Sequence, residues 1–475
     1  MFGVKFKNTQ APQLWIIPIS FAFLILIGTI VLKMPFSLNP GQQISWVDSL
    51  FTATSAVCIT GHATISISEV FDFSGQMVLL FLIQMGGVGI FTSSLIMVVV
   101  VGQRLSLADE QVIQATVGQL KTVRPMDIFI YACFFIFFFE ALGAVLYLMG
   151  ANHSTGYVGL LVDPASGLAG DDFALVLWDS IFHSVSAFCN AGFSLYPEGM
   201  VRMKSSPYFL GLLSSLVVMG GLGLMTMINL RYWYFWRRNF MTRGSLLLQT
   251  KVTLLMTLIM IVFGTAVFLI FECNHALKDC DGVWLKFFNS FFQAASSRTA
   301  GLNSVDLSQA NPVTLACLMI LMFIGGGSGS MAGGIKVTTF FVIVVAAWFV
   351  LRRKEDIQVF KRRIPFKLVH IAMMIGVLFT TGFAIALLCL IALESGHPST
   401  QLELGWLAII FDGLSAYCTV GLSTGATALM TSGGKLVLVA MMYVGRILTL
   451  TLAVYLLRPW EKSYVKYPEE QISLG

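Results

Sequence analysis

Four short segments of the chain carry the same residue types at the same spacing. In each segment a phenylalanine precedes a glycine by ten residues, and small residues fill much of the stretch between them. The four pairs are Phe51 and Gly61, Phe182 and Gly192, Phe291 and Gly301, and Phe411 and Gly421. Because the glycines are 131, 109 and 120 residues apart, the chain is predicted to repeat a unit of about 120 residues.

Glycines at these positions could build an ion site from backbone. Glycine adopts the positive φ values that turn successive carbonyl oxygens toward one axis. Four such strands around a pseudo-fourfold axis would replace the hydration shell of a cation with backbone oxygens. The alternative is that the glycines only allow helices to pack closely. The predicted ion-binding residues are Cys58, Ile59, Thr60, Gly61, Cys189, Asn190, Ala191, Gly192, Thr299, Ala300, Gly301, Cys418, Thr419, Val420 and Gly421.

The composition excludes a soluble protein. Of the 475 residues, 57% are hydrophobic and only 11% are charged, whereas about 25% of an ordinary soluble domain is charged. Mean hydropathy is +0.83. The sequence contains no HExxH or Walker pattern and its six histidines are scattered, so an enzyme is not expected. The aromatic and basic segment 231–243 is interpreted as an anchor at the membrane surface, and no nucleic acid is expected as a partner.

Apolar runs define the elements that must position the four segments. Spanning a bilayer as a helix takes about 20 apolar residues. Eight longer runs occur at 14–32, 75–101, 127–149, 207–230, 252–271, 312–350, 366–393 and 434–457. Four pieces too short to span lie between them, at 47–57, 173–188, 283–297 and 405–417, and these suit re-entrant helices.

This alternation predicts an all-α membrane protein with four tandem span–pore-helix–span repeats around one pseudo-fourfold pore. The repeats are expected at 1–125, 126–250, 251–365 and 366–475. Of the 29 lysines and arginines, 20 fall in the N-terminal segment, in 102–126, 231–251 and 351–367, and in the tail 458–475. The positive-inside rule then places both termini in the cytoplasm, with the short helices entering from outside.

A glycine-rich stretch interrupts the sixth run. Residues 325–334 read GGGSGSMAGG, and each glycine costs about 1 kcal/mol within a helix. We expect a broken helix with a loop beneath the filter, the alternative being a passive kink. Arg446 lies in the middle of the last span, where a charge costs at least about 2.5 kcal/mol, so it should face this loop. The predicted gate comprises Gly325, Gly326, Gly327, Ser328, Gly329, Ser330, Gly333, Gly334, Lys336 and Arg446, with Lys336 extending toward the cytoplasm.

Other polar residues leave alternatives open. Glu140 is interpreted as either an ion-coupling site or a hydrogen-bonding group facing the bundle. Asp179, Asp281 and Asp412 lie just before or within the short helices, where carboxylates either cap helices or attract cations. Cys273 and Cys280 share one short loop and could form a disulfide in an oxidising compartment.

Around the four glycines the sequence resembles a known superfamily. The stretches TATSAVCITG from Thr52, SAFCNAGF from Ser186, SRTAGLNSVD from Ser297 and SAYCTVGLSTG from Ser415 are similar to filter segments of the Ktr/Trk/HKT potassium transporters. The early first filter leaves no room for the extra N-terminal helix pair of the Trk branch. The tail KYPEEQISLG, from Lys466, also resembles the Ktr branch.

The resemblance implies potassium uptake through a channel-like pore with a degenerate filter, gated by the loop and Arg446. It also implies a homodimer in the bacterial inner membrane, surrounded by lipid, with a cytosolic nucleotide-binding ring of the KtrA or TrkA kind. Sodium is a candidate activator. In the plant branch a serine at the first filter glycine accompanies sodium selectivity, so Gly61 favours potassium. Arg298 is expected to brace the third filter through backbone carbonyls.

Two alternatives to this function remain open. One is a sodium- or proton-coupled secondary transporter. The other is a sodium-conducting pore of the same fold.

Overall fold

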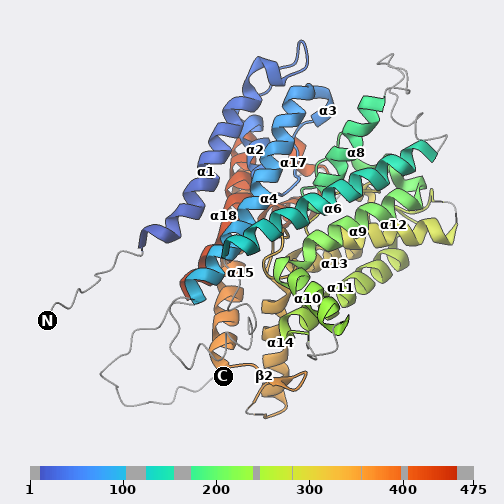
Figure 1. Ribbon diagram of the computed structural model, residues 1–475. Helices are drawn as coiled ribbons and strands as arrows, with labels where there is room; N and C mark the ends of the chain where they lie inside the picture. Colours follow the sequence, from blue (N-terminus) through green and yellow to red (C-terminus); the bar gives the residue numbers. More distant parts are fainter. Residues whose placement is uncertain are drawn as a thin grey trace.

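The chain folds into a bundle of helices in a computed structural model that describes residues 11–102, 125–153, 173–238, 246–280, 282–354, 356–396 and 405–456 (Figure 1). The first ten residues and the tail after residue 456 lie outside the described residues. The prediction that both termini are cytoplasmic therefore concerns parts of the chain that the structure does not describe.

The helices follow the predicted alternation of long and short segments. The first repeat contains α1 (Ala11–Lys33), η1 (Pro35–Ser37), α2 (Trp46–Val57), α3 (Ile67–Val70) and α4 (Phe73–Gly102). The second contains α6 (Pro125–His153), α8 (Phe173–Phe188), η3 (Gly199–Ser205), α9 (Pro207–Leu222) and α10 (Leu224–Arg238). The third contains α11 (Leu248–Glu272), α12 (Val283–Ser296), η4 (Leu307–Gln309), α13 (Pro312–Phe323) and α14 (Val337–Leu351). The fourth contains α15 (Phe366–Glu394), α16 (Trp406–Tyr417), α17 (Ala426–Leu429) and α18 (Ser432–Leu456).

The four short helices α2, α8, α12 and α16 match the predicted re-entrant pieces to within one residue at each end. A serine begins the first of them: the Ser45 hydroxyl accepts from the Asp48 amide and so satisfies a free N–H of the first turn. We refer to these four as the pore helices.

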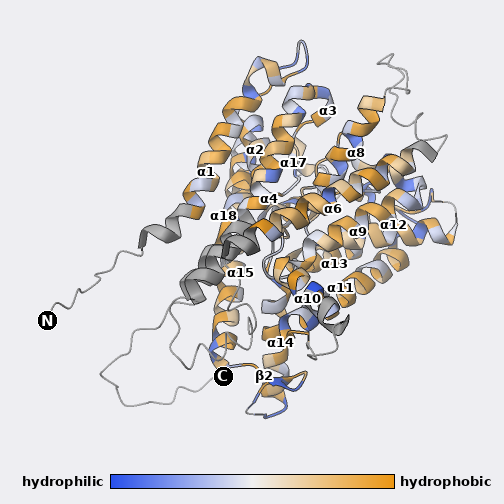
Figure 2. Cartoon of the chain, in the orientation of Figure 1, coloured by the Kyte–Doolittle hydropathy of each residue, from blue (hydrophilic) through white to orange (hydrophobic). Residues whose placement is uncertain are grey.

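Apolar surface covers the outside of the bundle. Phe134, Val262 and Leu388 are all more than half exposed, and hydrophobic colour dominates the outer helices (Figure 2). Within the described residues, three helices are long and apolar enough to cross a membrane: Ile130–Ala151, Leu248–Glu272 and Phe366–Glu394. The bent pair Pro207–Leu222 and Leu224–Arg231 counts as a fourth. Such surface requires hydrocarbon around it, so this is a membrane protein.

Two of the predicted spans are broken, and only one break was expected. The run 312–350 divides as predicted into α13 and α14, whose facing ends are joined by a bridge between Ile324 and Ile335. The run 207–230 was predicted to be one span, and that prediction is wrong. The chain bends by 95° between α9 and α10, because Gly223 adopts φ 88° and ψ 146°, which no helix can continue.

The packing of the pore helices closes the four repeats into a ring. Each pore helix packs against helices of its own repeat. It also packs against the helix of the preceding repeat that we call the inner helix, which is α4, α9, α13 or α18. The contacts between repeats are α8 with α4, α12 with α9, α16 with α13, and α2 with α18. The last of these joins the fourth repeat back to the first.

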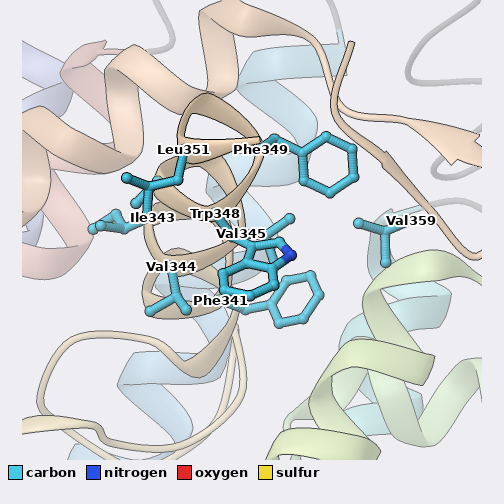
Figure 3. A pocket seen from close by; sticks show the side chains of 9 residues that line it. Phe341, Ile343, Val344, Val345, Trp348, Phe349, Leu351 and Val359 are labelled. Carbon is cyan, nitrogen blue, oxygen red and sulfur yellow. The ribbon is translucent and has the colours of Figure 1, made fainter. Parts of the chain in front are cut away.

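A small hairpin extends beyond α14. Strands β1 (Gln358–Val359) and β2 (Arg362–Arg363) pair antiparallel, with Gln358 opposite Arg363. Beside it, an apolar groove of about 550 Å³ runs along α14, lined by residues that include Phe341, Trp348 and Val359 (Figure 3). Among the described residues, no charged or carboxamide side chain lines this groove, so none of them offers a cation a side-chain ligand there.

Candidate functional site

The strands that follow the pore helices share one backbone conformation. The residue two positions before each glycine has a positive φ although it is not glycine: Ile59 (56°), Asn190 (56°), Thr299 (76°) and Thr419 (50°). The glycines follow, with φ of 86° at Gly61, 74° at Gly192, 75° at Gly301 and 95° at Gly421. Positive φ is a true outlier for β-branched residues. Three of the four residues are β-branched, whereas asparagine tolerates positive φ. Backbone strain gathered at one place in this way is typical of functional sites.

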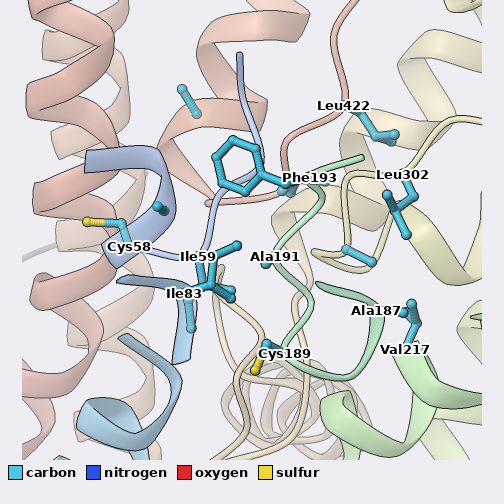
Figure 4. Close-up of a cluster of buried hydrophobic side chains, with 14 of the residues drawn as sticks. Cys58, Ile59, Ile83, Ala187, Cys189, Ala191, Phe193, Val217, Leu302 and Leu422 are labelled. Atoms are coloured by element: carbon cyan, nitrogen blue, oxygen red, sulfur yellow. The ribbon is translucent and has the colours of Figure 1, made fainter. Parts of the chain in front are cut away.

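The four glycines meet around one axis. A Cβ atom added to any of them would lie within 3.0 Å of a carbonyl oxygen in the next repeat, closer than real Cβ atoms approach. The contacts run in order around the ring: Gly61 to Ala191, Gly192 to Ala300, Gly301 to Val420, and Gly421 back to Thr60. Strands from all four repeats converge at this point, as shown by the labelled Ile59, Ala191, Leu302 and Leu422 (Figure 4). The sequence-predicted residues are therefore brought together in space.

The backbone amides and the carbonyl oxygens of these strands differ in their hydrogen bonding. In the first strand, the amides of Cys58, Ile59 and Thr60 donate to carbonyls of α2 at 2.8–3.1 Å, and the second and fourth strands repeat the pattern. The carbonyl oxygens of all fifteen predicted ion-binding residues accept no hydrogen bond from the described part of the chain. Apart from Gly192, which is half-buried, all of these residues are buried, and buried carbonyls almost always have a partner.

The segments after the glycines are held from behind by the pore helices. Asp412 of α16 is fully buried and accepts from the amides and hydroxyls of Thr424 and Thr427 and from the Ser423 hydroxyl, at 2.6–3.1 Å. In the first repeat Asp48 accepts from the Thr64 hydroxyl at 2.8 Å. Asp412 therefore braces the backbone that follows Gly421, whereas the sequence interpretation considered only helix capping or attraction of cations for this residue. Asp281 lies outside the described residues.

In the second repeat a histidine holds the segment that follows the glycine. His183 of α8 is buried, lies 2.9 Å from Asp179 Oδ1 and 3.1 Å from the Ser194 hydroxyl, and accepts from the Leu195 amide at 3.3 Å. Asp179 also accepts from the Tyr196 hydroxyl at 2.6 Å. The bracing role of His183 could not be recognised from the sequence, because the other pore helices have Thr52, Phe292 and Asp412 at this position.

Glycines on the inner helices form a second set that the sequence interpretation missed. Gly86, Gly220 and Gly445 each lie against the last turn of a pore helix, where a Cβ would collide with the carbonyl oxygens of Val57, Phe188 and Tyr417 respectively. The signal was present as MGGVG at 85–89 and MGGLG at 219–223. At the next position the repeats carry Gly87, Gly221, Gly326 and Arg446. The fourth repeat thus places an arginine where the other three have glycine.

Arg446 lies between the filter strands and the glycine-rich loop. Its side chain is 2% exposed, and its guanidinium donates to the Thr419 hydroxyl at 3.2 Å and to the carbonyl of Met331 in the loop. Gly333 of the loop is packed against Cys418 and Thr419. Residues 325–334, which we call the gate loop after the role predicted for them, therefore contact the fourth strand at Cys418 and Thr419.

Two other cations contact the gate loop. Arg298 was expected to brace the third filter, but its Nη2 donates to the carbonyl of Gly325 in the loop at 3.1 Å. Lys336 was expected to extend toward the cytoplasm, but it is half-buried and donates to the Ala332 carbonyl at 2.6 Å. Both side chains therefore stay at the loop, because its backbone carbonyls outside regular helix offer the acceptors that apolar surroundings lack.

The remaining polar residues are also placed. Glu140 faces the bundle, where it accepts from Gln84 at 3.0 Å and from the Cys189 thiol at 3.3 Å. Cys273 and Cys280 are not joined by a disulfide in the structure, so the bridge considered from the sequence is not formed there. Glu272 and Glu394, which the sequence interpretation did not single out, accept from the amides of Asn311 and Thr431 near the starts of α13 and α18.

The architecture is that of a predominantly helical membrane protein with four repeats closed around glycine-ended strands, and such an arrangement suits the passage of ions. The chain belongs to the TrkH family of cation transport proteins, whose model matches residues 17–464.

Similar proteins cover almost the whole chain. Ktr system potassium uptake protein B of Vibrio alginolyticus is 33% identical over 97% of this chain and 94% of its own length. The protein of the same name from Bacillus subtilis is 31% identical over 99% and 98%. Potassium/sodium uptake protein NtpJ of Enterococcus hirae is 31% identical over 97% and 96%. The crystal structure of the potassium transporter TrkH from Vibrio parahaemolyticus matches with a TM-score of 0.70 at 17% identity, over 96% of this chain and 86% of that one.

Proposed function

We propose that this protein takes up potassium through a pore whose selectivity filter consists of backbone carbonyls from Cys58–Gly61, Cys189–Gly192, Thr299–Gly301 and Cys418–Gly421. The observation that carries the proposal is a set of carbonyl oxygens, on four strands that meet at one axis, that accept no hydrogen bond from the residues the structure describes. Dehydrated potassium is a partner that such oxygens bind well. The negative ends of the four pore-helix dipoles point to the same region and favour a cation.

The proposed gate is the gate loop together with Arg446, Lys336 and Arg298. The loop and the Arg446 guanidinium lie immediately below the fourth filter strand. A fixed positive charge there repels a cation that leaves the filter, and in surroundings of low dielectric this repulsion is strong. Potassium would pass when the loop and the arginine move aside together.

Potassium is the favoured ion because all four repeats have glycine at the filter position. Two of the relatives are named for potassium uptake, and NtpJ is named for both potassium and sodium. A sodium-conducting pore of the same fold is therefore the second candidate. A carrier coupled through Glu140 has less support, because that carboxylate is engaged by Gln84 and Cys189. We also propose sodium as an activator of potassium uptake.

The assembly is proposed from the relatives. Several of them are named as parts of a Ktr system, which supports a cytosolic nucleotide-binding ring of the KtrA or TrkA kind as the partner subunit. We further propose a homodimer with one pore per subunit, set in lipid of the bacterial inner membrane with both termini cytoplasmic. The four repeat units are proposed at 1–125, 126–250, 251–365 and 366–475.

The experiment compares Gly61→Ser with Gly41→Ser in cells that lack their own potassium uptake. Both glycines have positive φ, 86° and 83°, but a Cβ on Gly61 meets the second strand whereas a Cβ on Gly41 meets nothing within 4 Å. We expect Gly61→Ser to reduce potassium uptake or convert it to sodium uptake, and Gly41→Ser to leave uptake unchanged. Unaltered uptake by a Gly61→Ser protein present at normal levels would contradict the filter.

A further inference from the structure

The second broken helix meets the gate loop. The break between α9 and α10 lies below the second filter strand, where Gly220 packs against the carbonyl of Phe188 and Gly221 lies near the side-chain amide of Asn190. The gate loop passes the same point from the third repeat. A small void of about 10 Å³ between them is lined by residues that include Gly221, Gly326 and Arg298.

Two backbone hydrogen bonds join the break to the loop. The Gly327 amide donates to the Gly221 carbonyl at 2.9 Å, and the Leu224 amide donates to the Gly329 carbonyl at 3.1 Å. The backbones are also in direct contact. A Cβ on Gly223 would lie 2.5 Å from the carbonyl oxygen of Ser328, and one on Gly326 would lie 2.7 Å from that of Gly221.

Both bonds use groups that the break itself leaves without partners. In a continuous helix the Gly221 carbonyl would accept from the Met225 amide, and the Leu224 amide would donate to the Gly220 carbonyl. The bend at Gly223 removes these partners, and helix ends within a membrane must find others. The gate loop supplies an acceptor for one group and a donor for the other. Moving the loop away would therefore leave polar backbone unpaired on both sides of the contact.

We propose that the break at 220–224 holds the gate loop in its blocking position, with Gly223 and Leu224 as positioning residues. The inference rests on the proposed gating role of the loop and extends it to a second helix. Arg298 holds the first residue of the loop, Gly325, and Arg446 holds Met331 in its second half. The break holds Gly327 and Gly329, which lie between them. Opening then requires α9, α10 and the loop to separate at one contact.

The first test removes one hydrogen-bond donor. Leu224 is the first residue of α10, where proline fits a helix and the missing N–H breaks no helical bond. Leu224→Pro therefore deletes the bond to Gly329, while Leu224→Ala measures the loss of the side chain alone. We expect maximal potassium uptake to rise severalfold in Leu224→Pro above Leu224→Ala. The KM for potassium and the preference over sodium should stay unchanged, since the filter strands are intact.

The second test adds a methyl group at the contact. Gly223→Ala forces a Cβ toward Ser328, and Gly282→Ala is its matched control. Gly282 has φ 89° and ψ 152°, almost the conformation of Gly223, but nothing lies within 4 Å of its Cβ position. We expect faster maximal uptake in Gly223→Ala and wild-type uptake in Gly282→Ala. If Leu224→Pro does not accumulate in the membrane, the comparison of Gly223→Ala with Gly282→Ala tests the role of the break by itself.

The results separate this inference from the proposed function. If Gly61→Ser alters ion choice but neither Leu224→Pro nor Gly223→Ala changes maximal uptake, the filter stands and the role of the break is wrong. A parallel rise in KM and loss of ion preference would also overturn it, because the break would then support the filter and not the loop.

Discussion

Arg298 of the third filter segment donates to the carbonyl oxygen of Gly325 over 3.1 Å. The first residue of the gate loop is thereby tied to the strand that precedes Gly301. In the other three repeats the residue at this position is Cys58, Cys189 or Cys418, which cannot reach so far. In the third repeat this position must hold a loop, whereas in the other repeats it faces a helix. The third repeat accordingly has an arginine where the others have cysteine.

Replacing this arginine by the residue of the other repeats gives the first prediction. Arg298→Cys removes the donor to Gly325, so the gate loop should be released at one end. We expect higher maximal potassium uptake and reduced thermal stability, since the Gly325 carbonyl is left buried without a partner, at a cost of about 1–3 kcal/mol. Rubidium uptake and thermal unfolding in detergent measure the two effects. Unchanged uptake in a folded variant would show that this contact is only structural.

Arg446 gives the second prediction. Arg446→Gln removes the positive charge below Thr419 but retains a hydrogen-bond donor, whereas Arg446→Lys retains the charge. If the barrier is electrostatic, uptake should rise severalfold in Arg446→Gln and much less in Arg446→Lys. Initial rates of potassium uptake at saturating concentration provide the measurement. Equal rates in both variants would indicate that the guanidinium acts through its shape or hydrogen bonds alone.

Asp412 gives the third prediction. Its two oxygens accept five hydrogen bonds from Ser423, Thr424 and Thr427. In Asp412→Asn one of these oxygens becomes an amide that can only donate, so backbone or hydroxyl donors lose their acceptor. We expect a loss of about 2–4 kcal/mol in the free energy of unfolding and weaker discrimination between potassium and sodium. Competition of sodium with rubidium uptake checks the second effect. Wild-type stability would mean that water replaces the lost acceptor.

The ion pair between Asp48 and Lys435 gives the fourth prediction. It joins α2 to α18 with a 2.8 Å contact and so closes the ring between the first and fourth repeats. Partial burial would raise the pKa of Asp48, but hydrogen bonds from Lys435, Ser45 and Thr64 outweigh it and hold the pKa below the usual 3.8. The pair therefore stabilises the fold above that pH, and its contribution is lost as the pH falls through the lowered value.

Lys435→Met should be less stable than wild type at pH 7, by less than about 1 kcal/mol because both groups are partly exposed to water. The difference should shrink as the pH falls toward 3. Thermal unfolding in detergent across this range tests the sign, with Lys278→Met as an exposed control. A difference that grows on acidification would rule out the pair as its cause.

The order of elements was predictable because each element depends on its neighbours in sequence. Apolar runs and their lengths located the pore helices to within one residue, and six glycines in 325–334 located the loop. The break at Gly223 was missed because MGGLG contains only three glycines, and MGGVG in α4 contains as many without a break. Whether such a segment bends depends on what packs against it.

By itself, the sequence determined that this chain is a four-fold repeated membrane protein and which backbone segments could bind a cation. Periodic spacing and apolar length suffice for that, since they act through local conformation and lipid. Only the tertiary structure decided what the charged and polar side chains contact. Arg298 reaches the loop and not its own filter, Lys336 folds back, and His183 braces a strand. In apolar surroundings, charged and polar side chains bond to the nearest unpaired backbone groups, and the three-dimensional packing determines where those groups lie.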